Sequence, residues 1–276
     1  MDARIHGLRF VANTLRHDVI KMLAESKSGH TAGPLGMADV FAALYFDFLN
    51  VNPENSLDDK RDFLILSNGH ICPVLYAALA NKGFFDKEEL FSLRKLGSRL
   101  QGHPHRSSLP GLETTSGPLG SGLSQAAGMA LVLLREKKNN KVVCLTSDGE
   151  HQEGNHWEAV LFASKYKLSN LIVIVDRNRI QIDGVTEEIM PLKSLKEKYL
   201  AFGWGVIEIN GNNMGEIVHA LDKAKSNKNN PVVIIANTTP GKGVSFMEND
   251  FKWHGKVPSL DEAERALFEI ANKRVA

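Results

Sequence analysis

Clusters of like charge, long apolar runs and cysteines are all scarce in this 276-residue chain. Lysines and arginines are spread along the sequence and the formal net charge is only +1, so a basic surface for nucleic acid or anionic lipid is not expected. No uninterrupted apolar run approaches the roughly 20 residues that cross a bilayer. We therefore expect no nucleic-acid partner and no membrane, and a small-molecule ligand instead.

The two cysteines, Cys72 and Cys144, lie far apart within apolar stretches. Their spacing is not that of a metal site, and both fit the pattern of small buried hydrophobic residues in a reducing compartment. The first residues carry charges at Arg4, Arg9 and Arg16, without the apolar stretch of a secretory signal. Together these features predict a cytoplasmic protein.

The composition, with 43% hydrophobic and 24% charged residues, is that of an ordinary globular protein. No internal repeat, low-complexity tract or Pro/Gly/Ser linker divides the chain. Because α/β folds of this length commonly form one unit, we expect a single domain over residues 1–276.

Helical and strand-like apolar patterns alternate along the chain. Asp86 and Glu89 predict a capping box at a helix start. The stretch 98–122 is dense in Gly, Pro, Ser and His, and such a long loop in a compact domain is usually functional. The alternation predicts an α/β fold of three layers, α/β/α, around a mostly parallel sheet. Helices are expected over 8–22, 37–49 and 157–165, and strands over 63–66, 142–146, 171–175 and 232–236.

Polar motifs follow three of the predicted strands, namely Ser67–His70, Ser147–Gly149 and Asp176–Asn178. In parallel sheets, ligands bind in the crevice at the carboxyl ends of the strands. We therefore expect these three loops to converge on one site.

Within these loops, Asp148 and Asn178 are candidates for a metal site. Asp148 precedes Gly149, where the absent side chain lets a backbone amide approach a phosphate. Asn178 lies thirty residues later, and Ile180 offers a backbone carbonyl. Such oxygen ligands suit octahedral Mg²⁺ when a diphosphate completes the shell. The alternative is that Asp148 caps a helix and Asn178 forms a turn.

This spacing resembles the metal motif of the thiamine diphosphate enzymes. In that motif a glycine usually stands where this chain has Ser147, and the asparagine is often doubled where this chain has Arg177. Neither difference removes a proposed ligand.

Several loops narrow the resemblance to one family. Residues 28–39 are similar to the amino-terminal signature of transketolases, with Thr31 in place of the usual proline. The family's remaining loops are matched in the same order by Ser67–His70, Gly102–Pro104, Glu113–Gly122 and Trp253–Gly255. The chain is thus identified as a member of the transketolase family.

The resemblance implies a thiamine-diphosphate-binding fold of the diphosphate-side (PP) type, with thiamine diphosphate and Mg²⁺ as cofactors. Glu153 resembles the family's acid that links two active sites across the dimer, although an ordinary first-turn helix glutamate is an equal alternative. Histidines would hold ketose hydroxyls and move protons, since imidazole can do both near neutral pH. The implied catalytic residues are His30, His70, His103 and His254; the cofactor-binding residues are His70, Gly117, Pro118, Leu119, Asp148, Gly149, Glu153, Asn178 and His254; the metal ligands are Asp148, Asn178 and Ile180.

The resemblance covers only the first of the family's three domains. Thiamine enzymes need a glutamate on the aminopyrimidine ring to activate the cofactor, and in transketolases this glutamate belongs to a second module. We therefore expect a separate carboxyl-terminal subunit, in a heterotetramer of two pairs. The implied reaction moves a two-carbon ketol unit from a ketose phosphate such as xylulose 5-phosphate to an aldose phosphate such as ribose 5-phosphate.

Other interpretations remain. A split ketolase for another sugar phosphate of the apulose type, or a synthase of the deoxyxylulose phosphate type, would have a similar site. A cofactor-binding regulatory pseudo-subunit is disfavoured because Asp148, Asn178 and the histidines are retained. Gly120–Gly122 lacks the third glycine of a dinucleotide loop, and Thr239–Gly243 lacks the Walker spacing, so the latter is interpreted as a loop bordering the cofactor site.

Overall fold

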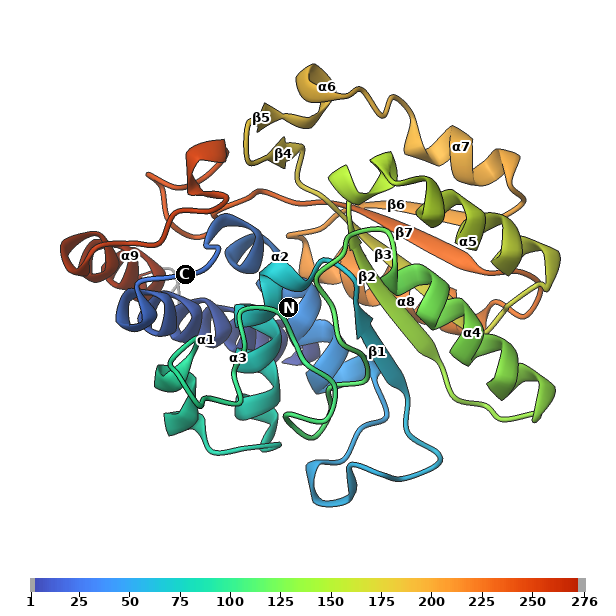
Figure 1. Cartoon of the computed structure of the whole chain (residues 1–276), viewed down its shortest axis with the longest axis horizontal. Helices are drawn as coiled ribbons and strands as arrows, with labels where there is room; N and C mark the ends of the chain where they lie inside the picture. The colour runs from blue at the N-terminus through green and yellow to red at the C-terminus, as the bar shows by residue number, and fades with distance from the viewer. Residues whose placement is uncertain (1–2, 273–276) are drawn as a thin grey trace.

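A five-stranded parallel sheet lies at the centre of the protein, between two layers of helices (Figure 1). The computed structural model describes residues 3–272, and its strand order is β1-β2-β3-β7-β6. The predicted three-layer α/β/α fold around a mostly parallel sheet is confirmed. The strands are β1 Phe63–Leu66, β2 Val142–Ser147, β3 Leu171–Arg177, β6 Gly205–Asn210 and β7 Val232–Asn237, with a separate hairpin of β4 Ile180–Gln181 and β5 Gly184–Val185.

The helices form two unequal layers and enclose two hydrophobic cores. On one face of the sheet lie α1 Ala3–Ser26, α2 Ala32–Ala43, α3 Cys72–Lys82, α8 Met214–Ser226 and α9 Leu260–Asn272. On the other lie α4 Gly122–Arg135, α5 Gly154–Lys165 and α7 Leu195–Ala201. Shorter elements are the π-helical turn η1 Leu44–Phe48, the 3-10 turns η2 Pro53–Asn55, η3 Gly69–Ile71, η4 Lys87–Ser92, η5 Gly149–Gln152 and η6 Phe251–Trp253, and helix α6 Thr186–Ile189.

Alternate residues of each central strand enter different cores. In β2, Val143 and Leu145 belong to the first core, whereas Val142 and Cys144 belong to the second. Because both faces of the parallel strands are covered, the strands are continuous apolar runs. This explains why they could be predicted from sequence.

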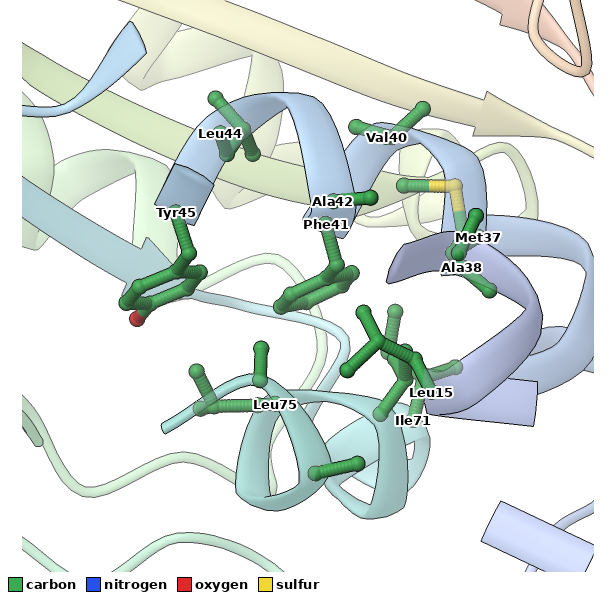
Figure 2. Close-up of a cluster of buried hydrophobic side chains, with 14 of the residues drawn as sticks. Leu15, Met37, Ala38, Val40, Phe41, Ala42, Leu44, Tyr45, Ile71 and Leu75 are labelled. Carbon is green, nitrogen blue, oxygen red and sulfur yellow. The ribbon is translucent and has the colours of Figure 1, made fainter. Parts of the chain in front are cut away.

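The first core contains a helix that begins earlier than expected. Figure 2 shows the rings of Phe41 and Tyr45 on the side that faces Leu15 of α1 and Leu75 of α3. The two rings are stacked, with their centroids 6.3 Å apart. The predicted helix 37–49 is instead α2 followed by the π-helical turn η1. Pro34 is tolerated near the helix start, where its missing N–H needs no partner. Gly36 is required by close packing, because a Cβ there would lie 2.9 Å from the carbonyl oxygen of Thr239.

Smaller predictions had mixed outcomes. Asp86 does accept a hydrogen bond from the Glu88 amide at 3.1 Å, but the Glu89 carboxylate bonds Arg99 instead of closing a capping box, so that prediction was wrong. Residues 93–121 contain no helix or strand, so the predicted loop 98–122 is confirmed except at Gly122, which begins α4. Cys72 and Cys144 are buried and unpaired. Within residues 3–272, no helix is both long and apolar enough to span a membrane.

Candidate functional site

A cavity of about 440 Å³ opens at the carboxyl ends of β1, β2 and β3. Its volume is in the range of small-molecule sites. Every predicted site residue lines it except Pro118, which is exposed and accepts a hydrogen bond from the Ser121 hydroxyl at 2.7 Å. The lining residues are His30, His70, His103, Gly117, Leu119, Ser147, Asp148, Gly149, Gln152, Glu153, Asn178, Ile180, Gln181, Ile182, Asp183 and His254.

Asp148 occupies the turn directly after β2, and its side chain is buried. Its carboxylate accepts hydrogen bonds from the Gly149 amide at 2.7 Å and from the Arg179 amide at 2.8 Å. It also forms an ion pair with Arg177 at 2.9 Å. Burial raises the pKa of Asp148, and the neighbouring Arg177 guanidinium opposes that rise. The β2 and β3 loops are thereby joined through this one carboxylate.

Asn178 follows β3 and is also buried. Its side-chain oxygen accepts from the Ile180 amide at 3.0 Å, and its nitrogen donates to Asp176 at 2.8 Å. The Ile180 N–H can only donate, so the Asn178 atom that it meets must be the oxygen. These two bonds therefore fix which way the Asn178 side-chain amide is turned. Burial also raises the pKa of Asp176 to about 7.

The structure brings the three predicted metal ligands to one rim of the cavity. Only Asp148 among them carries a charge. In residues 3–272 no group of three or more His, Cys, Asp or Glu side chains is placed to hold a metal ion. A hard cation at this rim would therefore need oxygen ligands besides those of this chain.

Three histidine rings meet in the cavity, and we call His30, His70 and His254 the open cluster. Ring centroids are 5.2 Å apart for His30 and His70, 5.5 Å for His30 and His254, and 5.2 Å for His70 and His254. Burial lowers the pKa of His30 to about 4 and that of His70 well below its usual value, and it also lowers the pKa of His254. Neutral imidazoles of this kind can accept or donate a proton.

Arg94 is a residue of this site that the sequence analysis missed. Its guanidinium donates to the Ser28 hydroxyl at 3.1 Å and to the Gly102 carbonyl at 3.2 Å, which joins the His30 loop to the His103 loop. Burial, and after it the charge of Arg94, lowers the pKa of His103. Arg94 has no local signal, because it lies in an ordinary polar stretch and one of the two loops that it joins is 66 residues away in sequence.

Glu150 is a second missed residue, and its side chain is fully buried. It accepts from the Ser67 hydroxyl, from the Gly120 amide at 2.8 Å and from the Ser147 amide at 3.2 Å. Burial raises the pKa of this carboxyl. Glu150 thus connects the end of β1, the long loop and the end of β2. The one feature of the sequence that could have identified Glu150 as a site residue is its position directly after Asp148-Gly149.

Another histidine group, the closed cluster of His151, His156 and Tyr199, is buried and is not part of the cavity lining. His151 Nδ1 lies 2.9 Å from the Ser147 carbonyl, and the Tyr199 hydroxyl lies 2.9 Å from His151 Nε2 and 2.8 Å from His156 Nε2. A carbonyl only accepts, so His151 Nδ1 donates to it and the Tyr199 hydroxyl donates to His151 Nε2. Tyr199 then accepts from His156. Burial lowers the pKa of His151 to about 4 and that of His156 well below its usual value.

The cavity lining also contains polar atoms without protein partners. Nδ1 of His30, Nδ1 of His254 and Nε2 of Gln181 are buried and have no hydrogen-bond partner among residues 3–272. Buried polar groups in native proteins are normally satisfied, so these atoms are placed for a polar ligand. Gly149 leaves room for its approach, since a Cβ there would lie only 3.0 Å from Gln181 Nε2. Carboxylate, amide and carbonyl oxygens beside imidazoles fit a diphosphate with Mg²⁺ and a hydroxylated substrate.

Comparison with known proteins identifies relatives along nearly the whole chain. The family model described as "Transketolase, thiamine diphosphate binding domain" matches residues 8–270. The chain is 39% identical over 270 residues to one subunit of the apulose-4-phosphate transketolase of Phocaeicola vulgatus, covering 98% of this chain and 96% of that protein. It is 42% identical over 263 residues to the 6-deoxy-6-sulfo-D-fructose transketolase subunit SqwG of a Clostridium species, covering 95% and 96%.

The fold is likewise shared with solved structures. The crystal structure of transketolase from Campylobacter jejuni has a TM-score of 0.91 and 35% sequence identity with this chain. The match covers 98% of this chain but only 43% of that one. The chain therefore corresponds to less than half of that transketolase, whereas it spans nearly all of the two subunits above.

Proposed function

Because this chain belongs to the transketolase family as its thiamine diphosphate binding domain, we propose that it is the amino-terminal subunit of a two-chain transketolase. The complete enzyme moves a two-carbon ketol unit from a ketose phosphate such as xylulose 5-phosphate to an aldose phosphate such as ribose 5-phosphate. Support comes from two relatives that are named as subunits and that this chain matches almost end to end.

The observation that carries this proposal is the single cavity in which the metal-ligand oxygens and the open cluster meet. Asp148, Asn178 and the Ile180 carbonyl would hold Mg²⁺, and Gly149, whose amide bonds the Asp148 carboxylate, would leave room for the diphosphate beside it. Thiamine diphosphate, when bound, supplies the carbon nucleophile for cleaving and forming carbon–carbon bonds. Of the other predicted contacts, His70, Gly117, Leu119, Glu153 and His254 line the same cavity, and Pro118 does not.

The histidines then have a defined task. A ketose hydroxyl loses a proton as its carbon–carbon bond breaks, and the oxygen of the acceptor gains one as the new bond forms. Imidazoles with lowered pKa values, as at His30, His103 and His254, are neutral near pH 7 and can accept the first proton. We assign proton transfer and hydroxyl binding to these three side chains, with His70 beside them.

A second subunit would complete the site. We propose that it supplies the glutamate for the aminopyrimidine ring and that two such pairs form a heterotetramer. The subunit names of the relatives support a partner chain. The free, buried cysteines support a cytoplasmic location, and the two cores on one sheet support one domain over residues 1–276.

The proposal is tested by purifying the chain with and without its partner and following two-carbon transfer from xylulose 5-phosphate to ribose 5-phosphate. We expect turnover only in the mixture. Turnover by the chain alone would show that no second subunit is needed.

The cofactor site is tested separately by calorimetry on the assembled protein. Asp148→Ala removes the proposed charged metal ligand, and we expect the affinity for thiamine diphosphate with Mg²⁺ to fall by about 100-fold or more. Asp261→Ala, on the exposed start of α9, is the control and should bind normally. Undiminished binding in Asp148→Ala would remove the proposed metal site.

A second candidate is ketol transfer from a different sugar. The names of the two subunit relatives favour it, since they refer to apulose 4-phosphate and to 6-deoxy-6-sulfo-D-fructose. Measuring kcat/KM of the assembled enzyme for these donors and for xylulose 5-phosphate decides between the candidates. A preference of tenfold or more for either alternative donor would replace the pentose assignment.

A further inference from the structure

Glu150 is a fully buried carboxylate to which the proposed reaction gives no task. It is not part of the cavity lining, although the preceding Gly149 is. Its hydrogen-bond partners within the described chain are the Gly120 and Ser147 amides and the Ser67 hydroxyl, and none of these groups carries a charge. A buried carboxylate without a cation beside it is costly in stability. Stability of the fold therefore does not explain why a carboxylate stands here.

The two amides that donate to Glu150 belong to different parts of the cavity wall. Ser147 lines the cavity and ends β2, directly before the proposed metal ligand Asp148. Gly120 directly follows Leu119, which lines the cavity as part of the long loop. The Gly120 amide meets one carboxylate oxygen at 2.8 Å, and the Ser147 amide meets the other at 3.2 Å. Glu150 therefore bridges the turn after β2 and the long loop.

Ser67 adds a third segment to this contact. It is buried and begins the loop after β1 that carries His70, another residue of the cavity lining. The Ser67 hydroxyl donates to Glu150 and accepts from the Gly122 amide at 3.0 Å. A Cβ at Gly122 would collide with the Ser67 side chain, so this approach requires glycine. Through Ser67, the carboxylate also holds the loop after β1 against the end of the long loop.

The pattern of donors around Glu150 requires a carboxylate. Both of its oxygens accept from backbone amides, one from Gly120 and the other from Ser147. A glutamine has nearly the same shape, but it has one accepting oxygen and an NH₂ group that only donates. Whichever way that side chain turned, its NH₂ would meet a backbone N–H. A neutral replacement would therefore push one of the two segments away.

We propose that Glu150 is a positioning residue for cofactor binding, which acts with Ser67 to hold three segments of the cavity wall at the spacing that the cofactor requires. These segments are the loop after β1, the long loop and the turn after β2. The inference rests on the proposed function for the identity of the ligand, thiamine diphosphate with Mg²⁺. Because the buried charge lowers stability while it positions the wall, cofactor affinity and stability should separate when Glu150 is replaced.

Calorimetry of the chain assembled with its partner, titrated with thiamine diphosphate in excess Mg²⁺, tests this role. In Glu150→Gln we expect the affinity for the cofactor to fall by about tenfold or more, as for other groups that orient ligand-binding residues. The melting temperature, followed by circular dichroism, should fall no further than in the control below, because the variant also removes a buried charge. An unchanged affinity in Glu150→Gln would overturn the proposal.

Asp62→Asn is the matched control. Asp62 is also a buried carboxylate that bridges two backbone amides, from Asn50 at 2.9 Å and from Lys141 at 2.7 Å. It lies at the opposite ends of the same two strands, β1 and β2. We expect Asp62→Asn to lower the melting temperature and to keep the affinity for the cofactor within about threefold of the wild type. Equal losses of affinity in the two variants would mean that Glu150 only stabilises the fold, and the proposal would be rejected.

Ser67→Ala tests the same contact with a smaller change, and it serves alone if Glu150→Gln does not fold. It removes one donor to Glu150 and one acceptor for the Gly122 amide. We expect a loss of cofactor affinity of about threefold or more. The double variant S67A/E150Q should be within about twofold of Glu150→Gln, because residues in one hydrogen-bond network are not additive. Unchanged affinity in Ser67→Ala, or losses that multiply in the double variant, would contradict a shared role.

The same preparations separate this inference from the proposed function. A wild-type assembly that binds thiamine diphosphate but transfers no ketol unit from any sugar phosphate would reject the activity. The role of Glu150 would then still be decided by calorimetry. An active assembly in which Glu150→Gln and Ser67→Ala both bind the cofactor normally would reject that role and leave the activity standing.

Discussion

The open cluster and the closed cluster both contain buried histidines, but the first lines the cavity and the second does not. Burial lowers the pKa of His30 in the first and of His151 in the second to about 4 in both cases. Their ring nitrogens differ: Nδ1 of His30, a residue of the cavity lining, has no partner among residues 3–272, whereas both nitrogens of His151 are bonded. A lowered pKa alone therefore does not identify a catalytic histidine. Our proposal for the open cluster rests in addition on the unbonded ring nitrogens of cavity-lining residues.

One atom of the closed cluster complicates this rule. Nδ1 of His156 is also buried without a partner within the described chain, but His156 is not part of the cavity lining. An unbonded nitrogen that no substrate can reach carries a cost in stability and no function. A histidine is therefore proposed as catalytic only when it has an unbonded ring nitrogen and also lines the cavity.

The largest effect is expected from the open cluster. His30→Ala removes an imidazole placed for proton transfer, so kcat of the assembled enzyme should fall by about 10²–10⁴-fold. Cofactor affinity should change by less than about threefold, and the free energy of unfolding should change little, because the side chain borders a cavity. Steady-state kinetics and calorimetry measure these quantities. His105→Ala, at an exposed position, is the control and should leave both quantities unchanged. If His30→Ala lowered cofactor affinity as much as kcat, His30 would instead be assigned to cofactor binding.

The closed cluster should show the reverse pattern. Tyr199→Phe leaves His151 Nε2 and His156 Nε2 buried without a hydrogen bond, and each unsatisfied group costs about 1–3 kcal/mol. We expect the free energy of unfolding in urea to fall by about 2–4 kcal/mol while kcat of the folded enzyme stays within about twofold. Tyr166→Phe, on the exposed end of α5, is the control. A large loss of kcat in Tyr199→Phe with normal stability would give the closed cluster a role in the reaction.

The sequence predicted the strands β1, β2, β3 and β7 of the sheet but not β6. Strands such as β2 and β3 are buried on both faces, so their apolar runs are continuous and easily recognised. The edge strand β6 was missed because it is largely not buried and carries exposed polar residues such as Glu208, whereas the other edge strand, β1, is an apolar and mostly buried run. Helix α2 began earlier than predicted, because Pro34 fits the start of a helix and Gly36 is required by a tertiary contact that no local pattern reveals.

Some residues of the candidate site could likewise be predicted from the sequence and others could not. Asp148 and Asn178 were found because strand ends place neighbouring loops together, a rule that follows from topology. Arg94 and Glu150 were missed because they act by joining loops that are distant in sequence. Their roles depend on which backbone atoms meet after folding. Local patterns can therefore identify the groups that contact a ligand more readily than those that hold the contacting loops together.

The smallest expected effect concerns the stability of the protein in acid. It tests how much protonation of a buried imidazole of the closed cluster lowers the free energy of unfolding. The folded-state pKa of His151 is lowered from 6.5 to about 4, so between these values the unfolded chain binds a proton that the folded protein does not. Stability from the neutral imidazole is thus complete above pH 6.5 and is lost as the pH falls toward 4. At pH 5.5 the loss amounts to about 1 kcal/mol for one imidazole. Urea titrations at pH 7 and pH 5.5 measure how much the free energy of unfolding falls with acid. In His151→Leu this fall should be smaller by about the same amount, whereas His219→Leu, at an exposed position, should leave it unchanged. An unchanged acid loss in His151→Leu would mean that the folded protein accommodates the charged ring, and the contrast between the two clusters would then rest on their hydrogen bonds alone.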